Sequence, residues 1–187
     1  MKSVSSLLLA LFLLTPVFGI CQNTDIKEIP FKIAGGKTIS VKVSDRGALA
    51  AENDKIKITA ASVLIGPSRQ NSKAPALIWS FGFKSKANDA IAKITVENVF
   101  PSDTAVLLIK DDHPKLKNGS WIGQIENGDP TGSSNAWLES KKYSAFIFRF
   151  TVFYKNGTQS ALDQLALFSE DDKQFFLRNA QQLKNAK

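Results

Sequence analysis

Apolar and polar residues alternate along most of the chain between residues 28 and 168, which is the pattern of half-buried β-strands. In residues 77–84 the apolar positions predict one buried face, made of Leu77, Trp79, Phe81 and Phe83. Similar patterns predict strands at 28–33, 39–43, 55–64, 92–97, 121–125, 146–154 and 161–168. The sequence therefore predicts a protein built mainly of short β-strands.

Turn signals separate several of these strands. Gly35-Gly36 interrupts the first alternating region, so residues 28–43 are predicted to form a β-hairpin. Asn156-Gly157 predicts a second hairpin, and Asn118-Gly119 is the same strong turn signal. Pro30 lacks an amide hydrogen, which predicts that the first strand lies at the edge of its sheet.

Two further regions depart from simple alternation. Ala105 to Ile109 form a continuous apolar run, which predicts a strand covered on both faces. From Lys110 to Ser140 the pattern weakens and Gly, Asn, Asp, Ser and Pro are frequent, with 121–125 resembling a strand. We expect this second region to be rich in loops.

The end of the chain predicts one amphipathic α-helix over residues 170–185. Ser169 is a suitable N-cap, and three acidic residues follow it in the first turn, where carboxylates favour the positive end of the helix dipole. Phe176, Ala180 and Leu183 then fall on one stripe. We expect this stripe to pack on the strands.

About nine short strands followed by a single helix predict an all-β fold, namely an antiparallel β-sandwich with a C-terminal amphipathic α-helix. An immunoglobulin-like topology is the leading version, because Trp79 in a central strand suits such a core. The cysteine pair of antibody-type domains is absent. The sequence thus predicts the arrangement of strands only, and its residues indicate no specific family.

The N-terminus predicts a secretory signal peptide over residues 1–21. Lys2 supplies a positive charge and the apolar stretch from Leu7 to Phe18 is 12 residues long, whereas a membrane-spanning helix needs roughly 20. Cleavage after Gly19 or Cys21 fits the small-residue rule, and residues 22–187 are expected to form a single domain. We therefore expect a periplasmic or secreted protein, attached to a membrane only if Cys21 is lipidated.

Charge adds little to this picture. The chain has 24 basic and 17 acidic residues, for a formal net charge of +7. The basic residues are scattered, which is typical of a solvated surface and not of a nucleic-acid site. No nucleic-acid partner is expected.

Catalytic motifs are not recognisable in the sequence. His113 is the only histidine, so metal centres built on several imidazoles are excluded. We expect no enzyme activity, no cofactor and no metal site. One alternative remains open, which is hydrolysis by carboxylates from Asp111, Asp112, Glu126 and Asp129.

The candidate ligand-binding residues are aromatic: Trp121, Trp137 and Tyr143, in or beside the irregular region. Exposed rings can anchor a protein partner or stack on a sugar. The leading hypothesis is a non-enzymatic binding or adaptor module of the cell envelope that recognises another protein through loops 110–140. The alternative is a carbohydrate-binding module for an envelope glycan, and a competing interpretation is that these rings cover the end of the core.

Overall fold

The computed structural model describes residues 26–44, 47–69, 75–87, 89–101, 103–126 and 145–167. These residues form an all-β structure in which every strand pair is antiparallel, which confirms the predicted fold class at this level. The predicted signal peptide (1–21) and the predicted helix (170–185) lie outside the described residues.

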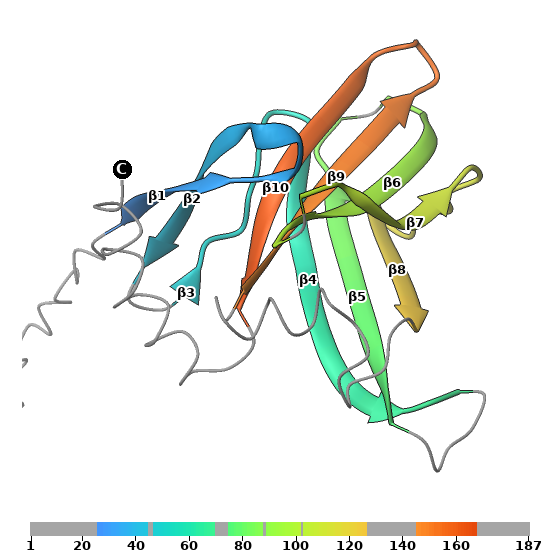
Figure 1. Cartoon of the computed structure of the whole chain (residues 1–187). Coiled ribbons are helices and arrows are strands. Elements are labelled where there is room, and N and C mark those ends of the chain that lie inside the picture. Colours follow the sequence, from blue (N-terminus) through green and yellow to red (C-terminus); the bar gives the residue numbers. More distant parts are fainter. Residues whose placement is uncertain are drawn as a thin grey trace, which may run out of the picture.

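Ten β-strands and one short 3-10 helix make up the described part (Figure 1). Their bounds are β1 (Lys27–Lys32), η1 (Ala34–Gly36), β2 (Thr38–Ser44), β3 (Gly47–Ala48), β4 (Ile56–Pro67), β5 (Pro75–Ser85), β6 (Ile91–Phe100), β7 (Val106–Asp111), β8 (Ser120–Glu126), β9 (Ala145–Tyr154) and β10 (Gln159–Leu167). They form three sheets, with strand orders β1-β2-β3, β4-β5-β8 and β10-β9-β6-β7.

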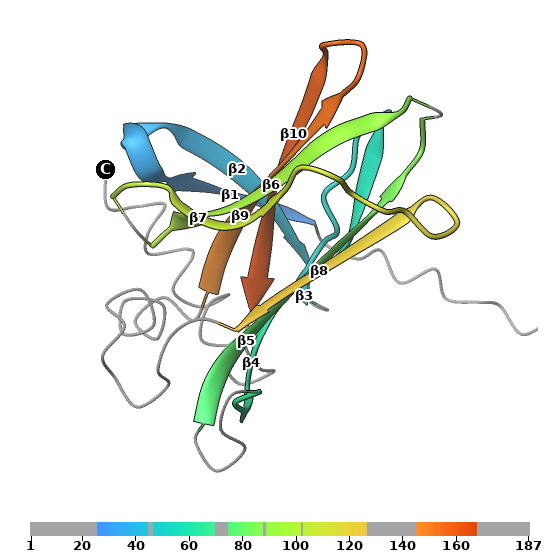
Figure 2. The ribbon, with the colours of Figure 1, turned by 90° about the vertical axis from the view of Figure 1, so that its right-hand side faces the viewer.

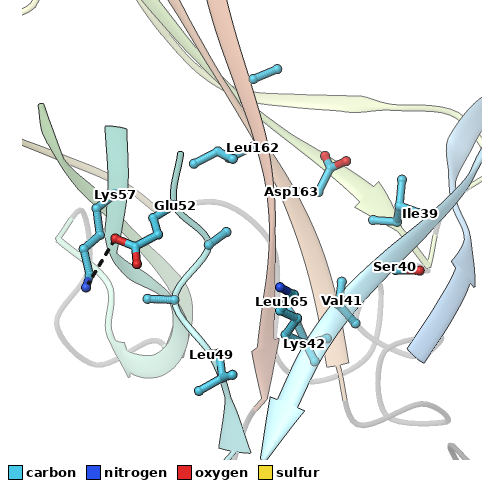
Figure 3. A pocket seen from close by; sticks show the side chains of 13 residues that line it. Ile39, Ser40, Val41, Lys42, Leu49, Glu52, Lys57, Leu162, Asp163 and Leu165 are labelled. Atoms are coloured by element: carbon cyan, nitrogen blue, oxygen red, sulfur yellow. Dashed lines mark ion pairs between the residues drawn. The ribbon is translucent and has the colours of Figure 1, made fainter. Parts of the chain in front are cut away.

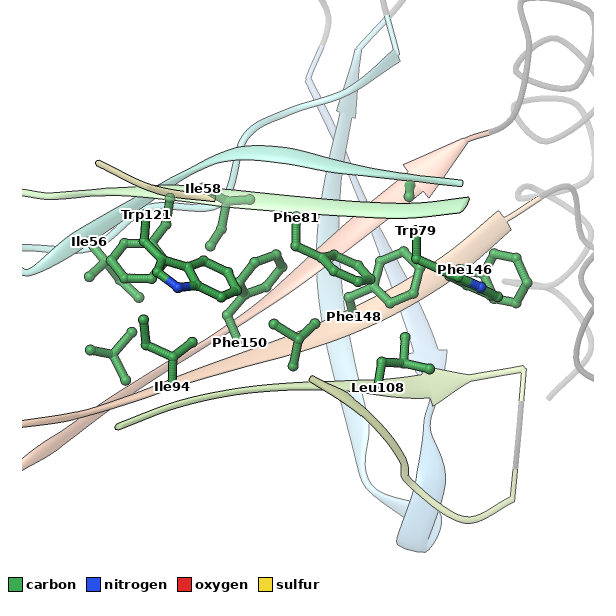
Figure 4. Close-up of a cluster of buried hydrophobic side chains, with 14 of the residues drawn as sticks. Ile56, Ile58, Trp79, Phe81, Ile94, Leu108, Trp121, Phe146, Phe148 and Phe150 are labelled. Carbon is green, nitrogen blue, oxygen red and sulfur yellow. The ribbon is translucent and has the colours of Figure 1, made fainter. Parts of the chain in front are cut away.

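The sheets β4-β5-β8 and β10-β9-β6-β7 face each other across the main core (Figure 4). Aromatic rings of β5 and β9 meet edge to face in this core: Trp79 lies 5.0 Å from Phe146, and Phe81 lies 4.9 Å from Phe148, between ring centroids. Edge-to-face pairs add to the gain from burial alone. The alternating residues of 77–84 that were predicted to point inward, such as Trp79 and Phe81, therefore lie at the centre of the main core.

A second core lies on the opposite face of the four-stranded sheet. Phe31 and Val41 of the β1-β2-β3 sheet belong to one buried cluster with Ile147 of β9 and Leu165 of β10. Successive side chains of a strand point to opposite faces, so Phe146 and Phe148 enter the main core whereas Ile147 enters the second. Figure 2 shows the β1-β2 hairpin and the β4-β5-β8 sheet on either side of β9 and β10.

The turn predictions are confirmed. At Asn118-Gly119 both residues have positive φ (51° and 75°), and the N–H groups of Lys117 and Ser120 each donate to the other's carbonyl oxygen at 2.8 and 2.9 Å. This is the two-residue turn for which Asn-Gly is favoured. The hairpin over residues 28–43 forms as β1 and β2, and Pro30 does lie in an edge strand.

The prediction that the run Ala105–Ile109 is covered on both faces is wrong. Strand β7 lies at the edge of its sheet, and the side chains of Val106 and Leu107 are 41% and 51% exposed. Leu108, in contrast, belongs to the main core. The second core draws its buried residues from the other three strands of this sheet, so the outer face of β7 has no such cover in the described part.

Gly123 makes room for the indole of Trp121 in β8. A Cβ atom at position 123 would lie 2.6 Å from Cζ2 of Trp121 and 2.9 Å from Cδ1 of Ile109. The indole cannot easily retreat, because it stacks on Phe83 (5.6 Å between centroids) and its N–H donates to Oδ2 of Asp111 at 2.9 Å. A side chain here would therefore overpack the core.

We expect Gly123→Ala to lower the free energy of unfolding by about 1–3 kcal/mol. At an unhindered strand position the same change would be stabilising, because alanine loses less chain entropy on folding. Denaturant unfolding measures the effect. Gly66→Ala is the matched control in the same sheet, since its added Cβ would meet the flexible tip of Ile78, at 2.7 Å from Cδ1. Equal effects of the two changes would contradict the role assigned to Trp121.

Candidate functional site

The aromatic residues expected to bind a ligand do not form an exposed site in the described part. Trp121 is 3% exposed and belongs to the main core. Burial of Trp121 agrees with the alternative interpretation, in which the aromatic rings cover the end of the core. Trp137 and Tyr143 lie outside the described residues, within which no aromatic side chain is classed as exposed.

The candidate carboxylates lie at opposite ends of β8. Asp111 accepts from the indole of Trp121, at the start of the strand, and from the backbone N–H of His113 at 3.0 Å. Glu126, at the far end, accepts from Oγ of Ser68 at 2.6 Å. The five residue steps between Trp121 and Glu126 correspond to about 17 Å of strand.

Each of the three candidate carboxylates within the described residues, Asp111, Asp112 and Glu126, has a partner. The hydrogen bond from Lys110 lowers the pKa of Asp112, and the hydrogen bonds from Ser68 and the backbone of Arg69 lower the pKa of Glu126. Asp129 lies outside the described residues. Within the described ranges no three His, Cys, Asp or Glu side chains are placed to hold a metal ion, and no helix there has the length and apolarity to cross a membrane.

A hollow of about 630 Å³ lies between β2, the segment 49–52, the start of β4 and β10 (Figure 3). More of its lining residues are apolar than polar, and the polar ones are four charged residues and one serine. The apolar lining residues are Ile39, Val41, Leu49, Ala50, Ala51, Ala161, Leu162 and Leu165, and the polar ones are Ser40, Lys42, Glu52, Lys57 and Asp163. Residues 39–42 and 49–57 thus meet residues 161–165, more than 100 positions further along the chain, to form this hollow.

Gln164 fixes one wall of the hollow. This side chain is 6% exposed and lies on β10. Its Oε1 accepts from the N–H of Ala51 at 2.7 Å, and its Nε2 donates to the carbonyl oxygens of Leu49 (3.1 Å) and Leu165 (2.7 Å). The amide is therefore fully used, which offsets the cost of burying it.

Asn53 fixes the same wall at the other end. Its Nδ2 donates to Oγ of Ser160 at 2.8 Å, and its Oδ1 accepts from the backbone N–H groups of Lys55 and Ile56, both at 2.9 Å. The turn into β4 is thereby coupled to the start of β10. The segment 49–53 therefore contacts β10 through side chains at both ends.

Ion pairs hold the charged groups of the hollow. Glu52 contacts Lys86 at 2.8 Å and Lys57 at 3.6 Å, and the hydrogen bond from Lys86, followed by the charge of Lys57, lowers its pKa. Asp163 accepts from Nε and a terminal nitrogen of Arg149 at 2.8 and 2.9 Å. This hydrogen bonding raises the pKa of Arg149.

The free edge of β10 lies along the hollow. In the turn after β9, Tyr154 donates its N–H to Thr158 at 2.9 Å and accepts from Gly157 at 3.0 Å. Antiparallel pairs alternate between hydrogen-bonded and non-hydrogen-bonded, so Leu162 bonds to β9 while the backbone groups of Ala161 and Asp163 point away from it. Within the described part, those groups face the hollow without a strand partner.

The facing edge of β2 is open at Ser40. The N–H of Ile33 donates to Lys37 at 2.8 Å, which sets Ile39 and Val41 as the residues that bond to β1. The carbonyl of Lys42 accepts from Leu49 at 3.0 Å, and β3 pairs with β2 only from Val43 onward. Two strand edges therefore border the same hollow in the described structure.

Comparisons of the chain with protein-family models, with curated proteins and with solved structures yield no match.

The hollow was not predicted from the sequence, although one residue signals it. Gln164 stands at an inward position of a strand whose inward neighbours are apolar, Leu162 and Ala166. A buried amide requires hydrogen-bond partners, so its position predicts that backbone from another segment approaches this strand. Which segment approaches could not be read from the pattern.

Hydrogen exchange of the β10 amides tests the assignment of its edge. We expect the amides of Ala161 and Asp163 to exchange rapidly, because they point into the hollow, and those of Leu162 and Gln164 to be protected by β9. The measurement is residue-resolved amide exchange by NMR. Protection of all four amides to the same degree would show that another segment covers the edge.

The role of Gln164 is testable by Gln164→Leu, which nearly conserves volume and removes both hydrogen-bonding groups. The N–H of Ala51 and the carbonyl of Leu49 would then lose their partner, so we expect a loss of about 1–3 kcal/mol in the free energy of unfolding. Gln159→Leu, at an exposed position of the same strand, serves as the control and should change stability by about 0.5 kcal/mol at most. A neutral Gln164→Leu would contradict the bridging role.

Proposed function

We propose that the chain is an exported, non-enzymatic module that binds another protein at the hollow between β2 and β10. One observation supports this above all others: the backbone groups of Ser40, Ala161 and Asp163 border the hollow without strand partners. Unpaired strand edges are templates for a further polypeptide. The apolar lining of the hollow adds surface that such a partner can bury.

The chemistry of the hollow favours binding over catalysis. Its two acids are each held by cations, Glu52 by Lys86 and Lys57, and Asp163 by Arg149. A general acid or base needs a pKa near the working pH, whereas the pKa of Glu52 is lowered. Among the residues that line the hollow no histidine or cysteine is present.

The proposed scaffold is a β-sandwich with immunoglobulin-like connectivity. The strand orders β4-β5-β8 and β10-β9-β6-β7 support it, as does the chain's repeated crossing between these two sheets, from β5 to β6, β7 to β8 and β8 to β9. The additional β1-β2-β3 sheet departs from a two-layer scheme. Packing of the helix 170–185 on this scaffold stays a prediction.

The proposed recognition surface is the hollow and not loops 110–140, which the sequence favoured. Residues 110–126 of that region form a strand end, a tight turn and β8, whose inward ring, Trp121, is buried. Carbohydrate binding through Trp121, Trp137 and Tyr143 is not favoured by any exposed ring among the described residues. An edge-lined hollow suits a polypeptide better than a sugar, because its open groups are regularly spaced along strands.

Site-directed photo-crosslinking tests the proposed function. A photoreactive side chain replaces Ala161, which is exposed beside the hollow, or Ile122, which is 80% exposed on β8. In envelope extract of the source organism we expect a discrete crosslinked polypeptide from position 161 and none of that mass from position 122. Excess unlabelled protein should suppress the product. Identical products from both positions, or none from 161, would refute binding at the hollow.

A further inference from the structure

We infer that the partner binds as an extended strand added to β10, with a basic side chain opposite Asp163. This inference rests on the proposed function and names the class of partner. The occupant is a segment of another polypeptide that becomes the next strand of the β10-β9-β6-β7 sheet. Backbone spacing, charge and the two walls of the hollow each support it.

The spacing of open backbone groups fits an antiparallel strand. Ala161 and Asp163 are two residues apart, and each presents an N–H and a carbonyl to the hollow, as derived from the turn at Tyr154. Leu165 is partly excluded, because its carbonyl accepts from Gln164 at 2.7 Å. An antiparallel partner therefore has two adjoining sites at which it exchanges both backbone hydrogen bonds with β10.

A row of alternating charges crosses the sheet and ends at the hollow. Glu97 pairs with Arg149 across β6 and β9, and Arg149 pairs with Asp163 across β9 and β10. The row therefore consists of one cation, Arg149, between two acids, Glu97 and Asp163. Opposite charges directly across a strand pair are stabilising and like charges are not. A lysine or arginine is the side chain that continues the row.

The remaining charges of the hollow leave this preference intact. Lys42 contacts Glu28 at 3.6 Å, and Lys57 contacts Glu52 at the same distance. Lys42 is thereby close to an acid of its own, Lys57 shares Glu52 with Lys86, and both lysines lie on different segments from Asp163. The two lysines and two acids that line the hollow balance, so the preference for a basic side chain concerns the position directly opposite Asp163.

The two walls define the side chains next to the basic residue. In Figure 3, Asp163 points toward Ile39 of β2, whereas Leu162 points toward the side of Glu52. Partner residues on the face of Asp163 therefore lie near Ile39 and Val41, where apolar side chains gain burial. Residues on the opposite face lie on the side of Glu52, toward which Leu162 points.

The test uses a capped heptapeptide with lysine at its centre, valine two positions to either side and serine elsewhere, added to the full mature protein. We expect the peptide to slow the amide exchange of Ala161 and Asp163 selectively. This exchange is measured by NMR as the peptide is titrated into the protein. Replacing the lysine by glutamate should weaken binding about tenfold, as removal of one favourable and introduction of one unfavourable contact implies. Absence of protection at millimolar peptide, or equal binding of both peptides, would overturn the inference.

N-methylation separates strand addition from other binding modes. Methylating the lysine amide removes a hydrogen bond to Asp163 and should weaken binding about tenfold, whereas methylating the next serine, whose N–H points away from β10, should have little effect. In the protein, Ala161→Pro removes the edge donor without touching the ladder to β9, since the N–H of residue 161 faces the hollow. This variant should fold and lose the peptide, and Ala161→Ser should retain it.

The outcomes distinguish the inference from the proposed function. If photo-crosslinking at position 161 captures a polypeptide but both N-methylated peptides bind equally well, the hollow binds protein in another way and strand addition is wrong. If crosslinking fails while the peptides behave as expected, the edge accepts strands in general, and the proposed function is wrong. Loss of folding in Ala161→Pro would contradict the assignment of the β10 edge itself.

Discussion

The burial of both faces of β9 is the constraint on which the rest of the structure depends. Phe146, Phe148 and Phe150 are fully buried on one side, and Ile147 is fully buried on the other. One opposing sheet cannot cover both faces of a strand. The β4-β5-β8 sheet buries the first set, so the β1-β2 hairpin must cover the second, and this hairpin also forms one wall of the hollow. The candidate site is thus a consequence of how the central sheet is covered.

Strand β10 lies at the edge of the sheet beside β9, and its outer backbone groups are covered only in part. Gln164 and Ser160 connect β10 to the segment 49–53 through side chains, which closes the inward side of the edge. These side-chain hydrogen bonds leave the main-chain groups of β10 unpaired, whereas a further strand would pair with them. Between the two bridges the backbone groups of Ala161 and Asp163 therefore stay open in the described structure. These open groups lie where we propose that another strand adds to β10.

Local patterns predicted the strands well, because alternation at a period of two and Asn-Gly turns are properties of short stretches such as 77–84 and 118–119. They failed for Ala105–Ile109, where an apolar run at a sheet edge has the same appearance as one inside a sheet. They also could not locate the hollow, whose walls come from residues more than 100 positions apart, as for Ala51 and Gln164. Whether Trp121 is exposed was left open by the sequence, because it depends on residues of other strands; in the structure Phe83 stacks on the ring and Gly123 leaves room for it.

An open strand edge carries a risk of unselective pairing, and the charges at the hollow bear on that risk. Natural edge strands are protected by charged side chains and by partial covering, and β10 has both, in Asp163 and in the neighbouring β2. A second copy of β10 laid antiparallel with Asp163 opposite Asp163 would place two acids side by side, which is unfavourable. A strand with a basic residue at that point meets no such penalty. Because specificity is a difference between affinities, the charge that disfavours self-pairing is also the charge that would select the basic strand we propose as the partner.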